Sequence, residues 1–286
     1  MQKHKLQMKL LDKDKYNLVL EPLKDVKVNN LFARSVIEKH VTGSVFVDDT
    51  SEPTSFCVVH PYGMALVFGA TTNKEFNQHL IAYMLNKSGF RTKVEWLQAF
   101  PPEWNEAIIE LLGINLFTPI TSTLHKSEGL VELNTRINFK FNKAKYLDFK
   151  NTLELNPFDV VRTDSLMFEK MNGTVVPKYF WDDADSFLNR GIGFSILDAG
   201  DPVSTAFSAF VHDDKLEIGI ETYDTQRGRG LAYYTCSALI DFCIGANLEP
   251  IWACRLENTG SVRLAERLGF EQAKYIPYYK LPFINK

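Results

Sequence analysis

Residues 227–232 are Arg227-Gly228-Arg229-Gly230-Leu231-Ala232, and they join a predicted strand at 216–222 to a predicted helix at 228–244. The first backbone N–H groups of a helix have no partner within it, so several of them point towards one spot. Glycine at positions 228 and 230 lets the main chain approach a ligand closely, and the positive end of the helix dipole favours negative charge. The turn is therefore predicted to bind an anion such as a phosphate.

Three explanations of a glycine-rich turn can be compared with the residues that follow it. A nucleotide P-loop has Lys and then Ser or Thr directly after its glycines, where this chain has Leu231, Ala232 and Tyr233. A dinucleotide site needs a small residue at 233 and an acid at the end of the next strand, whereas Glu249 precedes that strand. A plain tight turn remains the alternative, because two glycines alone are a weak signal.

The pattern Gln/Arg-x-x-Gly-x-Gly/Ala is met by Arg227, Gly230 and Ala232, and here the chain resembles the GNAT superfamily of N-acetyltransferases. The neighbouring segments follow in the family's order. They are a strand at 216–222, a strand at 250–254, Asn-Thr-Gly-Ser at 258–261 and Leu-Gly-Phe at 268–270. The amino-acid sequences of residues 217–222 and 261–270 resemble those of the bacterial subgroup that includes zwittermicin-resistance-like acetyltransferases.

The resemblance implies where a cofactor binds. In that family the strands before and after the glycine-rich helix splay apart, and the pantetheine arm of acetyl-coenzyme A lies between them as a substitute strand. Asn258 also suits the N-cap of the last helix, and the two roles are compatible. The implied cofactor-binding residues are Ile220, Thr222, Tyr223, Arg227, Gly228, Arg229, Gly230, Leu231, Ala232, Asn258 and Ser261.

Two acids on the strand before the turn are candidates for proton transfer. A lysine-like amine, with a reference pKa of about 10.4, must lose a proton before it attacks. Glu217 and Glu221 are four residues apart, so they share one face of the strand. Either is a candidate general base, a solvated strand face is the alternative, and the sequence does not separate the two. A backbone N–H near Thr222 is expected to stabilise the oxyanion.

One position departs from the family pattern. Many members carry a tyrosine in the last helix as the general acid for the departing thiolate, and this chain has Ala265 there. Tyr275, Tyr278 and Tyr279 are candidate replacements. A thiol with a pKa near 8.5 also leaves readily as the thiolate, so the acid is dispensable in principle.

The order of predicted elements indicates an α/β (α+β) fold with a mixed, mostly antiparallel sheet flanked by helices. We predict a domain at 1–130 and an acetyltransferase domain at 131–286. The predicted order in the first half matches that of the second, which indicates a duplication. The corresponding turn, 69–73, lacks GxG, so the first half is expected to be a degenerate GNAT-like domain that shapes the acceptor pocket.

The composition excludes several classes of function. The formal charge of −3 and the pI of about 6.1 argue against a nucleic-acid partner. No uncharged apolar run approaches the roughly 20 residues of a membrane helix. The four cysteines lack CxxC spacing and the six histidines are not paired, so we expect no metal.

We therefore expect an enzyme of the cytoplasm that moves the acetyl group of acetyl-coenzyme A to a primary amine of a small molecule by direct attack. The resemblance suggests a homodimer. A non-catalytic protein that binds or senses acyl-coenzyme A is the alternative, and nucleotide binding is a third. The identity of the amine is open.

Overall fold

The computed structural model describes residues 8–89, 91–119, 129–153 and 158–283, and the chain divides into two compact units. Unit 1 comprises Met1–Arg136 and Tyr275–Lys286, and unit 2 comprises Ile137–Lys274. The sequence predicts a boundary after residue 130, and the longer segment of unit 1 ends at Arg136. Because the last residues return to unit 1, that unit is built from two segments of the chain, whereas the prediction places the whole C-terminus in the second domain.

Unit 1 contains a sheet in the order β1-β2-β3-β4-β5-β14, in which β4 and β5 are parallel to each other. Off this order, β6 pairs in parallel with β7. Its strands are β1 (Lys9–Leu10), β2 (Ser44–Val47), β3 (Ser55–Val59), β4 (Met64–Gly69), β5 (Glu95–Phe100) and β6 (Leu116–Phe117). Its helices are η1 (Lys13–Lys15), α1 (Asn17–Lys24), α2 (Leu31–Ile37), α3 (Lys74–Met84), α4 (Glu103–Leu112) and η2 (Gly113–Asn115). Two strands, β7 (Val131–Phe141) and β14 (Phe270–Leu281), pass from one unit into the other.

Unit 2 contains a second sheet in the order β12-β11-β10-β9-β8, in which only β11 and β12 are parallel. Its strands are β8 (Val160–Arg162), β9 (Gly193–Asp198), β10 (Asp201–His212), β11 (Lys215–Thr222), β12 (Glu249–Ile251) and β13 (Ala253–Arg255). Its helices are α5 (Lys143–Thr152), α6 (Ser165–Lys170), η3 (Pro177–Tyr179), α7 (Ala184–Arg190), η4 (Asp224–Gln226), α8 (Leu231–Gly245) and α9 (Thr259–Arg267). The predicted fold class, a mixed and mostly antiparallel sheet fold flanked by helices, is confirmed.

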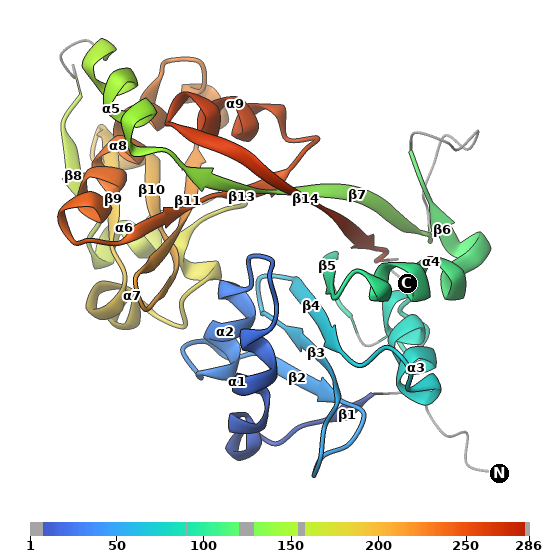
Figure 1. The fold of residues 1–286 in the computed structure, drawn as a ribbon. Helices are drawn as coiled ribbons and strands as arrows, with labels where there is room; N and C mark the ends of the chain where they lie inside the picture. The colour runs from blue at the N-terminus through green and yellow to red at the C-terminus, as the bar shows by residue number, and fades with distance from the viewer. Residues whose placement is uncertain (1–7, 90, 120–128, 154–157, 284–286) are drawn as a thin grey trace. The chain divides into compact units, whose positions relative to one another are not determined.

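The two faces of the second sheet are covered by different segments. Helix α8 packs across β9, β10 and β11, and its buried Leu239 lies in one cluster with Leu216 and Ile218 of β11 (Figure 1). On the other face the ring of Phe180 contacts Phe207 at a centroid distance of 5.4 Å. Since side chains alternate along a strand, Glu217 and Glu221 of β11 belong to this second face, opposite Ile218, as the sequence predicts.

Two predicted elements of unit 2 have different bounds in the structure. Helix α8 begins at Leu231 and not at residue 228, because Gly228 and Gly230 adopt left-handed backbone angles of φ 81° and 79°, which an α-helix does not contain. The single strand predicted at 250–254 is two strands, β12 and β13, which join different neighbours.

Helix α8 is buried along Leu231, Thr235 and Leu239, whereas Phe242 is 38% exposed. Cys236, Ile240 and Cys243 are buried in its place, so both cysteines of this helix act as small apolar side chains. Helices α1, α5 and α6 have no counterpart among the predicted elements.

Replacing Gly219 of β11 with Ala should destabilise the protein by about 1–3 kcal/mol, because a Cβ there would meet the Phe207 ring at 2.5 Å and overpack the sheet face. Gly245 is the matched control, since a Cβ there meets nothing within 4 Å and Gly245→Ala should be neutral or stabilising by up to about 1 kcal/mol. Chemical denaturation of both variants measures the difference. Equal stability of the two would contradict the close packing at Gly219.

Candidate functional site

Strand β11 has one edge that is only partly paired. It pairs in parallel with β12 from Lys215↔Glu249 to Glu217↔Ile251. The chain then turns away, because the carbonyl of Trp252 accepts a 3.0 Å hydrogen bond from the amide of Phe139 in β7, and β13 continues beside β7. Within the described part of the chain, residues 218–222 of β11 therefore pair with β10 alone. Their other edge has backbone groups available for a ligand.

The glycine-rich turn lies at the end of this open edge. Gly230 is the N-cap residue of α8, and no side chain caps the helix. Because the first amides of a helix have no partner inside it, those at the beginning of α8 are available to an anion. The left-handed angles of Gly228 and Gly230 make this turn a concave backbone site of the kind that binds phosphate groups.

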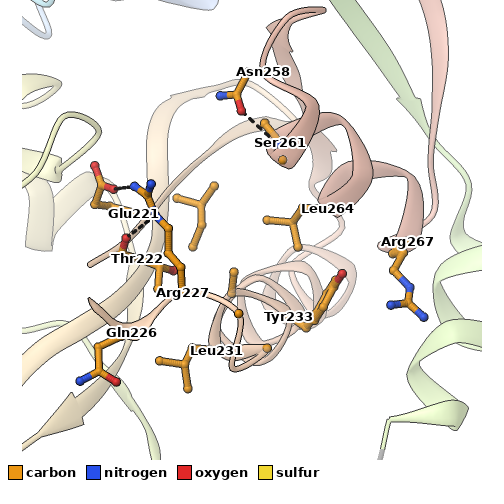
Figure 2. Close-up of a pocket in the computed structure, with 15 residues that line it drawn as sticks. Glu221, Thr222, Gln226, Arg227, Leu231, Tyr233, Asn258, Ser261, Leu264 and Arg267 are labelled. Carbon is orange, nitrogen blue, oxygen red and sulfur yellow. Dashed lines mark hydrogen bonds and ion pairs between the residues drawn. The ribbon is translucent and has the colours of Figure 1, made fainter. Parts of the chain in front are cut away.

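A cavity of about 670 Å³ joins the open edge, the turn and the beginning of α9, and all of its lining belongs to unit 2 (Figure 2). Most of the residues predicted for the site meet there. The predicted residues that line it are Ile220, Glu221, Thr222, Arg227, Gly228, Gly230, Leu231, Ala232, Asn258 and Ser261. Its size falls in the ordinary range of small-molecule sites, which is roughly 300–1,000 Å³.

Arg227 contacts other residues of the turn and of β11. Its Nε donates to the carbonyl of Thr222 at 3.1 Å, and its Nη2 lies 3.4 Å from Glu221 (Figure 2). The same Nη2 lies 2.8 Å from Asp224. With two carboxylates beside it, the guanidinium holds the shape of the loop more than it offers free positive charge to a ligand.

The carboxylate of Glu221 is surrounded by donors on both oxygens. Its Oε2 accepts hydrogen bonds from the amides of Thr174 and Val175 at 2.7 and 2.8 Å, and from the hydroxyl of Thr174 at 3.2 Å. Its Oε1 pairs with Arg227. Gly173 lies against it so closely that a Cβ would meet its Cγ and Oε2 at 2.7 Å. Glu221 therefore fastens the segment 172–175 to the end of β11.

The first turn of α9 forms the opposite wall of the cavity. Asn258 is the N-cap residue, and its Oδ1 accepts the amide of Ser261 at 3.2 Å. The hydroxyl of Ser261 accepts the indole N–H of Trp252 at 3.1 Å. Trp252, where the chain leaves β11, thus also fixes α9, and the predicted capping role of Asn258 is present.

Three predicted site residues do not line the cavity. The amide of Tyr223 donates to Val203 at 3.0 Å, so it is not available to a cofactor. The guanidinium of Arg229 lies over the ring of Phe158 at 5.7 Å and hydrogen-bonds Gln226. Glu217 is 5% exposed and lies opposite Ile251, where β12 still covers the strand.

Other residues of the wall have no place in the sequence-based prediction. They are Gln226, Tyr233, Gly260, Leu264 and Arg267. Leu264 and Arg267 follow Ser261 at spacings of three along α9, which places all of them on one helix face. Because Ser261 is among the predicted site residues, this spacing could have identified Leu264 and Arg267 from the sequence.

The position expected for a tyrosine acid is part of the core. Ala265 is fully buried in the cluster that joins α8, α9 and β11. The candidate replacements Tyr278 and Tyr279 have partners within unit 1, since Tyr278 stacks on Trp96 at 4.9 Å and Tyr279 donates to Asn105 at 3.1 Å. Tyr275 is 56% exposed.

Unit 1 has the same order of elements but a closed arrangement. There β5 continues to pair with β4 as far as Phe68, and the indole of Trp104 donates to the carbonyl of Gly69 at 3.1 Å. The start of α3 is capped by Asn73, whose side chain accepts the amide of Phe76. In the described residues of unit 1, the equivalents of the open edge and the uncapped helix are thus occupied by the protein itself.

Among the described residues, no cluster of three or more His, Cys, Asp or Glu side chains has an arrangement that would hold a metal ion. None of the helices in residues 8–89, 91–119, 129–153 and 158–283 combines the length and apolar character needed to cross a bilayer.

The comparisons with known proteins agree on one family. The family model described as GNAT acetyltransferase matches residues 21–279. An uncharacterized N-acetyltransferase of Bacillus subtilis (strain 168), YdfB, is 26% identical over 273 residues, which cover 94% of this chain and 97% of that protein.

Solved structures share the fold over nearly the whole chain. A GCN5-related N-acetyltransferase-like protein from Streptococcus suis has a TM-score of 0.66 at 22% identity, with 93% of this chain and 98% of that chain covered. A tandem GNAT protein from the clavulanic acid biosynthesis pathway has a TM-score of 0.57 at 10% identity, with 98% and 99% covered. At these identities the likeness concerns the fold alone.

Asn258→Ala should lower the free energy of unfolding by about 1 kcal/mol, because the first turn of α9 loses its side-chain cap. Thr259→Ala, at the next and exposed position, is the control and should change stability by no more than about 0.5 kcal/mol. Denaturant titration of both variants tests this, and an unchanged Asn258→Ala variant would show that the cap contributes nothing.

Proposed function

Because the chain belongs to the GNAT acetyltransferase family, we propose that it transfers the acetyl group of acetyl-coenzyme A to a primary amine of a small molecule. The observation that carries this proposal is the open edge of β11 ending at an uncapped helix start, both on one cavity. An extended amide-bearing arm attached to a diphosphate has the chemistry that such an arrangement complements.

The residues present fit this co-substrate. The open edge at 218–222 supplies backbone groups that would pair with the pantetheine arm as a neighbouring strand does. The amides at the beginning of α8 would bind the diphosphate, with the helix dipole adding to the attraction. Ile220, Leu231 and Leu264 supply the apolar part of the lining.

We propose direct transfer without an acetylated enzyme intermediate. The amine nitrogen attacks the thioester carbonyl carbon, the carbon–sulfur bond breaks, and coenzyme A leaves as the thiolate. Burial raises the pKa of Cys243 to about 12 and also raises the pKa of Cys236, so neither thiol of α8 is a nucleophile near neutral pH. A backbone N–H near Thr222 on the open edge would stabilise the oxyanion.

We propose Glu217 as the group that receives the amine proton, directly or through water. The argument comes from Glu221, whose oxygens already accept two backbone amides, one hydroxyl and one guanidinium group. Glu221 is therefore assigned to holding the segment 172–175, and proton transfer is assigned to Glu217, the other acid on the same strand face, which is buried and has an interaction of its own within the protein.

Two further features support a cytoplasmic location and a subgroup within the family. The cysteines of the structure are free thiols, which is the state kept in the reducing cytoplasm. The amino-acid sequences of residues 217–222 and 261–270 favour the zwittermicin-resistance-like subgroup of the family.

Gly230→Glu should weaken binding of coenzyme A at least about tenfold, because a carboxylate at the N-cap of α8 opposes the diphosphate and covers the amides. Gly200→Glu is the matched control, since Gly200 has a similar left-handed φ of 86° and open space around it but lies in the turn between β9 and β10. Isothermal titration calorimetry measures both affinities. If Gly230→Glu binds as well as Gly200→Glu, the diphosphate does not lie at this turn.

Glu217→Gln should lower kcat by about a hundredfold for an amine that supports turnover, whereas Glu221→Gln should lower it by less than about tenfold, because the amide oxygen still accepts the bonds of segment 172–175. The assay measures thiol release from acetyl-coenzyme A with a panel of primary amines. The reverse ranking would make Glu221 the base. Tight binding without amine-dependent thiol release by the unmodified protein would favour the alternative, a non-catalytic acyl-coenzyme A sensor, for which the buried Ala265 is the motivating observation.

A further inference from the structure

Two arginines line the cavity, and their surroundings differ. Arg227 is paired with Glu221 and Asp224, as described above. Arg267 forms no ion pair with any described residue, and its recorded partner is the ring of Tyr233, which lies 5.7 Å from the guanidinium carbon. The cavity thus contains one guanidinium group whose charge the described residues leave uncompensated.

Arg267 lies on the far side of the α8 start from the open edge. Figure 2 shows Glu221 and Arg227 on one side of α8 and Arg267 on the other, with Tyr233 and Leu264 between them. Tyr233 is in the first turn of α8 and Arg267 is the last residue of α9, so the cavity extends past the glycine-rich turn to side chains of both helices.

The order of these features matches the order of the parts of coenzyme A. If the pantetheine arm follows the open edge and the diphosphate lies at the turn, the 3′-phosphoadenosine must leave on the other side of the turn. The 3′-phosphate is a dianion on this end of the molecule, and a guanidinium group binds phosphate with paired, charge-assisted hydrogen bonds. Contact with the aromatic face of Tyr233 keeps the guanidinium in place.

We infer that Arg267, supported by Tyr233, forms a subsite for the ribose 3′-phosphate of the donor, so that the protein distinguishes coenzyme A from its 3′-dephosphorylated form. This inference rests on the proposed function, because it takes the donor to be an acyl-coenzyme A. It assigns to Arg267 a role in selecting the donor and none in the chemical step.

A structural role for the same side chain makes a different prediction. A cation in the last turn of a helix interacts favourably with the helix dipole, whatever the ligand. Arg263 is the matched control, because it is an exposed arginine one turn earlier on α9 that does not line the cavity.

The experiment measures the dissociation constants of coenzyme A and 3′-dephospho-coenzyme A by isothermal titration calorimetry. The unmodified protein should bind coenzyme A about 10- to 100-fold more tightly than the dephospho form, which is the range expected for hydrogen bonds to a charged group. Arg267→Gln should bind both ligands like the unmodified protein binds the dephospho form. Arg267→Lys should keep part of the preference, and Arg263→Gln all of it.

Each other result overturns the inference in a recognisable way. Equal affinity of the unmodified protein for both ligands means that the 3′-phosphate is not bound. An Arg267→Gln variant that loses affinity equally for both ligands places the guanidinium on the diphosphate. No binding of either ligand to the unmodified protein refutes the proposed function itself, and the subsite with it. Melting temperatures of all variants confirm that Arg267, an exposed residue, is not needed for folding.

Discussion

The site depends on the point where the chain leaves β11. Up to Ile251 the backbone of β12 pairs with the edge of β11. At Trp252 the backbone carbonyl instead accepts a hydrogen bond from the amide of Phe139 in β7. Beyond that point the main-chain groups on this edge of β11 have no strand partner, so they need water, a ligand or a side chain, as at Thr222, whose carbonyl accepts Arg227. The same Trp252 holds Ser261 through its indole, so the divergence of the strands and the position of α9 are fixed together. The cavity is the space that this divergence leaves.

The two units show how little separates an open arrangement from a closed one. Both have a helix that follows a central strand, and in both the next strand is parallel to it. In unit 1 that strand continues along its neighbour, and Trp104 occupies the carbonyl of Gly69. Asn73 takes an amide of α3 that Gly230, having no side chain, leaves available in α8. A few polar contacts in unit 1 thus pair the backbone groups whose equivalents in unit 2 are available to a ligand.

The sequence predicts the parts of the site that are local and misses those that depend on tertiary contacts. The glycines, the cap at Asn258 and the two acids of β11 follow from spacing and residue type, so they could be predicted. The break at Trp252 could not, because residues 250–254 read as one apolar strand and the change of partner is set by β7. Helix α5 escapes prediction because only Tyr146 of its residues is buried, so it has almost no apolar period. Its N-cap, Asn142, was the one local signal.

The charges around the turn are largely paired within the protein. Arg227 is paired with Glu221 and Asp224, so under the proposed function the attraction for a diphosphate would come chiefly from main-chain amides, which substitution of a side chain does not remove. Glu221 in turn spends its charge on Arg227 and on the amides of Thr174 and Val175. This carboxylate links the turn 223–229 to the segment 172–175. The pair Glu221 and Arg227 is thus a structural unit that keeps the open edge of β11 and the turn in register, and under the proposed function the proton transfer falls to the other acid of this strand face, Glu217.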